Sequence, residues 1–217
     1  MAEFTIYIGN KNYSSWSLRA WLMAKAAGIP FDEVLIPLWQ EGSEAELRRI
    51  SPTRKVPVLR HGNVTVWESL AIGEYLAELQ PAVRLWPEEA GARAVARAAS
   101  HEMHAGFLNL RRALPMNLRA SRPGRPVAPE VRADLDRIAA LWQDCRQRFG
   151  AAGRYLFGHF TIADAMYAPV VSRLRTYGIA FDGVAQAYAD TMWDHPALQE
   201  WAAAARIEPM VAAQYEL

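Results

Sequence analysis

The sequence predicts a two-part fold, in which an α/β unit with a mixed sheet precedes an all-helical unit. Short apolar runs with strand-like alternation occur only in the first third of the chain, with helical spacing between them. After Gln80-Pro81 only helical spacing remains. We expect a sheet unit over residues 1–80, a linker over residues 81–87 and a helical unit over residues 88–217.

The first unit begins with a strand-helix-strand pattern. Phe4 to Ile8 alternates as a strand does, and a helix is expected from Ser15 to Ala27, with Gly28 ending it. Val34 to Ile36 is the next strand. Two strands joined by a crossing helix lie parallel in one sheet.

The remaining elements of this unit complete a four-stranded sheet. Ser43 and Glu46 form a capping-box pattern for a short helix. Val58–Arg60 and Val64–Trp67 flank a turn-rich connection, which favours an antiparallel hairpin. Helical spacing resumes at Ser69. The predicted order is therefore βαβαββα, a mixed four-stranded sheet with helices packed on it.

The second unit contains several segments with helical periodicity. Thr161 and Asp164 form a second capping-box pattern before an apolar run that Pro169 interrupts. The expected helices otherwise span Glu88 to Met116, Glu130 to Phe149 and Pro196 to Arg206. Between the first two, Arg119 to Pro129 is rich in proline and arginine, so we expect a solvated loop there.

Composition excludes several classes of function. Lys and Arg total 24 against 23 Asp and Glu, so no net field attracts nucleic acid or anionic lipid. Without a signal peptide in Met1 to Asn10 or an apolar run of roughly 20 residues, a cytoplasmic protein is expected. The single cysteine, Cys145, excludes an internal disulfide and a CxxC pair. It falls on a helical apolar stripe and is expected in the core.

Ser14 and Ser15 stand at the predicted start of the first helix, where a hydroxyl can donate to a ligand thiolate. Lowering a thiol pKa by about two units requires about 2.7 kcal/mol in favour of the anion. One hydrogen bond to an ion gives roughly 1.5 to 3 kcal/mol, and the helix end adds roughly 0.3 to 1. Alternatively the serines only cap the helix, or Tyr13 or Tyr7 supplies the hydroxyl; Tyr7 is expected to be packed.

Two further motifs suit a small peptide ligand. A cis bond between Val56 and Pro57 would turn the Val56 backbone toward a bound peptide; the alternative is a plain strand-edge proline. Glu68 and Ser69 precede the third helix, where the Ser69 hydroxyl and free N–H groups can bind a carboxylate and Glu68 can face an ammonium group. The alternative for Ser69 is a simple N-cap.

The first long helix of the second unit carries candidates for a second-substrate pocket. His101 and His104 lie one turn apart, but no third ligand accompanies them, so no metal site is expected. We expect some side chains of this helix to face a cleft opposite the sheet unit. The C-terminal tail from Ile207 to Leu217 is expected to form another part of the same pocket. The pocket candidates on the helix are Met103, His104, Phe107 and Arg111.

Nearly the whole chain resembles a glutathione S-transferase, which joins a thioredoxin-like N-terminal domain to an all-helical domain. The resemblance is carried by three motifs: Val56-Pro57, Glu68-Ser69 with Ala71-Ile72 and Tyr75-Leu76, and Thr161-x-x-Asp164 after Gly158. Ser14-Ser15-Trp16-Ser17 followed by Arg19 is similar to the serine motif of zeta-type enzymes, which carry a cysteine in place of Trp16. The stretch from Glu102 to Asn117 resembles that of bacterial members with the same serine motif.

The resemblance implies a homodimeric detoxification enzyme that adds glutathione to a small electrophile, with no nucleic-acid or membrane partner and no metal. It implies Ser14 as the activator of the thiol and Ser15 as a ligand contact. The implied glutathione-binding residues are Lys55, Val56, Pro57, Glu68 and Ser69. Two alternatives stand beside this interpretation: a glutathione-dependent isomerase of zeta type, which acts on maleylacetoacetate, and a transferase fold kept as a non-catalytic interaction module.

Overall fold

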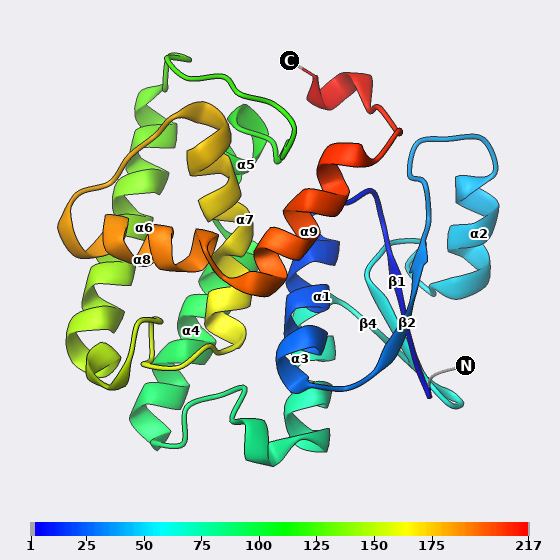
Figure 1. Cartoon of the computed structure of the whole chain (residues 1–217), viewed down its shortest axis with the longest axis horizontal. Coiled ribbons are helices and arrows are strands. Elements are labelled where there is room, and N and C mark those ends of the chain that lie inside the picture. Colours follow the sequence, from blue (N-terminus) through cyan, green and yellow to red (C-terminus); the bar gives the residue numbers. More distant parts are fainter. Residues whose placement is uncertain (1–2, 217) are drawn as a thin grey trace.

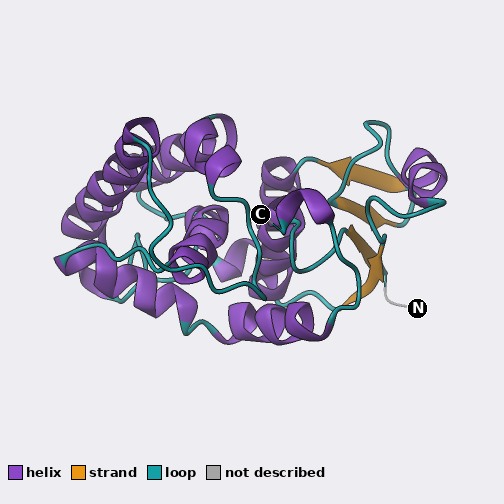
Figure 2. Ribbon diagram, turned by 90° about the horizontal axis from the view of Figure 1, so that it is seen from above, coloured by secondary structure: helices purple, strands orange, loops and turns teal. Residues whose placement is uncertain are grey.

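The computed structural model describes residues 3–216, and Figure 1 shows a small sheet on one side of the molecule and a group of helices on the other. Figure 2 shows the same separation from above, with the strands confined to one end. The predicted combination of a mixed α/β unit and an all-helical unit is confirmed.

The sheet has the order β2-β1-β3-β4. β1 (Phe4–Ile8) pairs in parallel with β2 (Phe31–Leu35), and antiparallel with β3 (Val58–His61). β3 in turn forms the predicted antiparallel hairpin with β4 (Val64–Trp67). The parallel pair and the hairpin are both as the sequence indicated, although β2 begins three residues earlier than expected.

Three helices belong to this part of the chain. α1 (Ser15–Ala27) ends at Gly28, whose φ of 68° is left-handed, as the glycine predicted. α3 (Ser69–Leu79) follows β4. The capping box expected at α2 (Ser43–Ile50) is wrong: Ser43 is the first helical residue, and its hydroxyl donates to the Gln40 carbonyl at 2.7 Å. Glu46 instead pairs with Arg49 on the helix surface.

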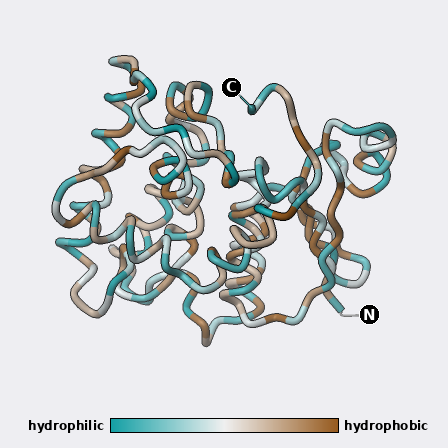
Figure 3. The backbone as a smooth tube through the Cα atoms, turned by 45° about the horizontal axis from the view of Figure 1, so that its top comes forward, coloured by the Kyte–Doolittle hydropathy of each residue, from teal (hydrophilic) through white to brown (hydrophobic). Residues whose placement is uncertain are grey.

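The second part consists of helices joined by loops in the described residues, with two isolated β-bridges between Tyr155 and His159. Its helices are α4 (Ala90–Ala105), α5 (Leu108–Ala113), α6 (Pro129–Phe149), α7 (Ile162–Tyr177), α8 (Gly183–Trp193) and α9 (Pro196–Ile207). Single-turn 3₁₀ helices occur at Pro81–Val83, Gly150–Ala152 and Ala213–Tyr215. Figure 3 shows hydrophobic and hydrophilic residues alternating along most of these helices, as expected when a helix buries one face; α7 is the exception, since nearly all its residues are buried.

The single long helix expected from Glu88 to Met116 is wrong. The helix is interrupted between α4 and α5, where Phe107 has a φ of 57°. A Cβ atom on Gly106 would lie 2.7 Å from the Glu102 carbonyl oxygen, so this close approach requires glycine. The break turns the chain and carries Arg111 on a separate short helix.

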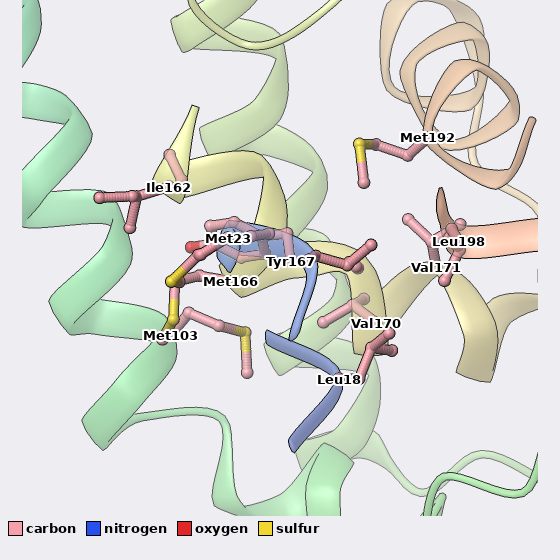
Figure 4. Packing of buried hydrophobic residues seen from close by; sticks show 14 of the residues in the cluster. Leu18, Met23, Met103, Ile162, Met166, Tyr167, Val170, Val171, Met192 and Leu198 are labelled. Carbon is pink, nitrogen blue, oxygen red and sulfur yellow. The ribbon is translucent and has the colours of Figure 1, made fainter. Parts of the chain in front are cut away.

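α7 forms the centre of the core. Its predicted capping box is confirmed, since Thr161 and Asp164 exchange hydrogen bonds at the N-terminus. The helix continues through Pro169, which the sequence had indicated as an interruption. Figure 4 shows Met23 of α1, Met103 of α4 and Met166 of α7 packed together in this core. The sheet unit and the helical unit therefore share one continuous hydrophobic cluster.

Two composition-based expectations can be compared with this fold. Cys145 is buried on α6, as its apolar stripe predicted. Within residues 3–216, no helix combines the length and the hydropathy that crossing a membrane requires.

Candidate functional site

Ser14 caps the N-terminus of α1 and lies at the start of a chain of hydrogen bonds. Its Oγ accepts from the Ser17 backbone N–H at 3.4 Å and donates to the Ser17 hydroxyl at 2.8 Å. Ser17 Oγ also accepts from the Gly9 N–H at 2.9 Å. Ser17, to which the sequence analysis gave no role, is fully buried. Its hydroxyl connects Ser14 to the residue that follows β1.

The neighbouring hydroxyl groups differ in how far they are engaged. Ser15 is half-buried, and its hydroxyl makes no hydrogen bond with any described residue. Tyr13 donates to Glu216 and accepts from Arg119 at 2.7 Å. Tyr7 is packed on the sheet, as expected. The serines are therefore the hydroxyls at the helix start without a carboxylate partner.

The two peptide-binding motifs lie on neighbouring elements. The Val56–Pro57 bond is cis, as favoured from the sequence. Ser69 is the first residue of α3 and not its N-cap, so the simple capping alternative is wrong; that position belongs to Glu68, whose φ of 69° is left-handed. Ser69 Oγ is buried and has no hydrogen-bond partner in the described part of the chain. Ser69 lines neither of the two cavities described below, but its neighbour Glu68 lines the smaller one. An unpaired hydroxyl at a helix N-terminus is a group that an anionic ligand can satisfy.

Two adjoining cavities connect these motifs. The smaller, of about 250 Å³, is lined by Trp16, Thr53, Lys55, Val56, Pro57, Glu68 and His104. The larger, of about 400 Å³, shares Trp16, Lys55 and Val56 with it and adds both serines and Arg111. The structure thus brings the predicted serine, Lys55-Val56-Pro57 and Glu68 positions to one place.

The larger cavity carries positive charge on its walls. The cations that line it are Arg54, Lys55, Arg111 and Arg173, and no carboxylate lines it among the described residues. Arg111 and Arg173 hydrogen-bond only to backbone carbonyl groups. Burial lowers the pKa of both, and the proximity of Arg111 contributes to lowering that of Arg173 to about 10. Both nevertheless remain cationic at neutral pH.

Trp16 lies between the two cavities and is fixed by arginines. The guanidinium carbons of Arg19 and Arg111 lie 4.4 and 4.5 Å from its ring centroid. Arg19 is buried; burial and the charges of Arg111 and Arg173 lower its pKa. Its Nε donates to the Met166 carbonyl at 3.0 Å. Cation–π contact of this kind orients the indole from both α1 and α5.

The four residues expected in a second-substrate pocket do not line one common cavity. Arg111 lines the larger cavity, while His104 lies in the smaller one beside Glu68. Met103 is fully buried against α1 and α7 (Figure 4), and Phe107 belongs to the same core. The interruption after α4 changes the direction of the chain. These four residues are close in sequence but therefore lie in the two different cavities and in the core.

The C-terminal tail, which the sequence analysis expected at the cleft, contributes an aromatic side chain to the larger cavity. Tyr215 lines the larger cavity and lies 5.2 Å from Trp39, between ring centroids. Glu216 lies 3.8 Å from Arg119 and 3.6 Å from Arg122. The expectation of a solvated loop is therefore wrong for these two arginines. Leu217, the last residue of the expected tail, lies outside the described residues.

Family comparisons agree with this geometry. Residues 13–79 match the glutathione S-transferase N-terminal domain, and residues 93–204 match its C-terminal domain. The chain is 27% identical over 179 residues to maleylacetoacetate isomerase of Rattus norvegicus, covering 80% of this chain and 79% of the rat protein. It is 30% identical over 161 residues to a probable maleylacetoacetate isomerase of Caenorhabditis elegans, covering 72% of each.

Solved structures show the same fold. A glutathione transferase homologue from Burkholderia, crystallised with bound glutathione, superposes with a TM-score of 0.69 at 24% identity, covering 94% of this chain and 97% of that one. Glutathione transferase Omega 2C from Trametes versicolor has a TM-score of 0.69 at 17% identity and covers 93% of each chain. With both family domains matched in order, the chain belongs to the glutathione S-transferase family.

Proposed function

We propose that this protein is a glutathione transferase in which the serines at the start of α1 stabilise the glutathione thiolate for attack on a small electrophile. The observation that carries this proposal is Ser69 Oγ, which is buried without a partner at the N-terminus of α3. The γ-glutamyl carboxylate of glutathione supplies the missing acceptor. Val56 lines both cavities and Pro57 lines the smaller one, so this segment would lie beside the bound peptide.

Ser14 is suited to stabilise the thiolate because its present hydrogen bond can be reversed. Hydroxyl hydrogens rotate, so Ser17 can donate to Ser14 in place of accepting from it. Ser17 Oγ would still accept from the Gly9 N–H, and Ser14 would be free to donate to the thiolate. Each hydroxyl in such a chain strengthens the next as a donor. Ser15, with its unengaged hydroxyl, is the second contact.

Glutathione titration tests the proposal directly. Trp16 lines both cavities and Trp39 the larger one, so binding should change tryptophan fluorescence, with calorimetry as the independent measurement. We expect saturable binding and conjugation of a general aryl halide electrophile. If neither method detects binding, the transferase proposal fails, and the alternative of a non-catalytic interaction module is favoured.

A second candidate function, isomerisation of an acidic substrate, has its own support. Arg111 and Arg173 leave guanidinium nitrogens without a partner in the described residues, on a cavity wall without carboxylates. Such a wall suits a substrate with carboxylate groups, and two of the relatives carry the name maleylacetoacetate isomerase or probable maleylacetoacetate isomerase.

The two candidates are separated by assaying each reaction on the same preparation. Glutathione-dependent cis–trans isomerisation of a maleyl substrate, with no stable conjugate, supports the isomerase. Conjugation of neutral electrophiles without isomerisation supports the transferase. A homodimer is part of both proposals, and sedimentation showing only monomer at micromolar concentration would contradict it.

A further inference from the structure

His104 occupies an unusual position for a residue of the helical unit. It projects from the last turn of α4 into the smaller cavity, where Lys55, Pro57 and Glu68 form the opposite wall. Its ring meets Trp16 edge to face, with 5.0 Å between centroids. Arg19 and Arg111 in turn hold Trp16, so the indole that packs against the imidazole is itself held in place.

The distance between His104 and Glu68 leaves room for a shared donor. His104 Nε2 lies 3.9 Å from Glu68 Oε2, too far for a direct hydrogen bond. Two acceptors that each lie about 2.9 Å from one tetrahedral ammonium nitrogen stand roughly 4 to 5 Å apart. The observed 3.9 Å is just below that range, so a small opening of the two side chains lets one ammonium group bridge them.

The protonation state of His104 agrees with an acceptor role. Burial lowers its pKa, with Arg19, Arg111 and His101 acting in the same direction and Glu68 opposing them. The imidazole is therefore neutral at neutral pH and has one nitrogen with a free lone pair. Nδ1 is buried and has no partner among residues 3–216, so no protein contact fixes the tautomer and a ligand can select it.

We propose that His104 is a specificity-determining residue that accepts a hydrogen bond from the α-ammonium group of the γ-glutamyl residue, together with Glu68. This rests on the proposed binding of glutathione. The carboxylate of the same amino-acid head group meets Ser69 and the free N–H groups of α3. The helical unit of the same chain thus completes recognition of a zwitterionic head group, and thiols that lack the α-amino group bind more weakly.

Two ligands and three variants test the assignment by calorimetry. The ligands are reduced glutathione and its desamino analogue, glutaryl-cysteinyl-glycine, which lacks only the ammonium group. His104→Phe keeps an aromatic edge against Trp16 but removes the nitrogen, and His104→Gln restores an acceptor. His101→Phe is the control, because His101 is exposed one turn earlier on the same helix.

We expect His104→Phe to weaken glutathione about 10-fold, the loss of one hydrogen bond to a charged group, and to leave the analogue unchanged. His104→Gln should recover most of the affinity, and His101→Phe should match the parent. Equal weakening of both ligands in His104→Phe, or no weakening of either, would overturn the role of His104. Failure of the parent protein to bind glutathione at all would instead contradict the proposed function.

Discussion

Replacing Ser69 with alanine separates folding from ligand binding, because the two effects have opposite signs. The Ser69 side chain is 0% exposed, and its hydroxyl has no partner in the described residues. A buried hydroxyl left without a hydrogen bond costs roughly 1 to 3 kcal/mol in mutational data. Alanine removes that cost together with a small amount of packing. The unliganded variant should therefore equal the parent in stability or exceed it by up to about 1 kcal/mol.

Glutathione binding should fall in the same variant. A hydrogen bond to a charged group contributes about 1.5 to 3 kcal/mol, which corresponds to roughly 10- to 150-fold in dissociation constant. At a glutathione concentration of about 100 times the parent's dissociation constant, ligand binding stabilises the parent by about 2.7 kcal/mol. A variant that binds about 100-fold more weakly gains only about 0.4 kcal/mol. Calorimetry and thermal unfolding with and without glutathione measure both effects.

Ser172→Ala is the matched control for this experiment. Ser172 is also a fully buried helical serine, but its hydroxyl donates to the Pro169 carbonyl at 2.9 Å, and both residues belong to α7. Its removal should destabilise the free protein by about 1 kcal/mol and leave glutathione affinity unchanged. If Ser69→Ala behaves in the same way, the Ser69 hydroxyl supports the fold alone and the reasoning from its unpaired state is refuted.

Three further predictions follow from individual side chains. Ser14→Ala should raise the pKa of bound glutathione's thiol by roughly one to two units, measured from thiolate absorbance against pH; an unchanged value would remove the assignment. Asp164→Ala should lower unfolding stability by roughly 3 kcal/mol, since its carboxylate accepts from Leu156, Thr161 and Tyr188, whereas exposed Asp144→Ala should not; equal melting temperatures would contradict this. Burial raises the pKa of Cys145 to about 12, so the native thiol should resist a disulfide reagent at about pH 8 and react only after unfolding.

Local sequence patterns predicted the fold well where the contacts they describe are local. The β3–β4 hairpin, the stop at Gly28 and the capping box at Thr161 all depend on residues that are close in the sequence. The same pattern failed at Ser43, because Gly42 takes the N-cap position in a left-handed conformation and Ser43 bonds back to the preceding turn. A capping motif specifies which hydrogen bonds are available, and the path of the chain before the helix decides which ones form.

The candidate site was less predictable on its helical side, for a related reason. Helical periodicity continues past Gly106, so nothing in the spacing shows that the helix breaks there and that Phe107 turns the chain. Because of this interruption, His104 and Arg111 line different cavities, although they are only seven positions apart in the sequence. Arg173, which lies about 60 residues further along, reaches the same cavity wall only through the packing of α7.

Trp16 explains why these separate side chains form one site. Its indole lines both cavities, contacts His104 on one side and lies against the guanidinium groups of Arg19 and Arg111. A cysteine, as in zeta-type enzymes, is too small to make these contacts together. The tryptophan therefore couples the side of the site proposed for the γ-glutamyl group to the cationic wall proposed for the second substrate. A smaller residue at position 16 would remove the contacts to Arg111 and to His104 at once, so the two cavities would change together.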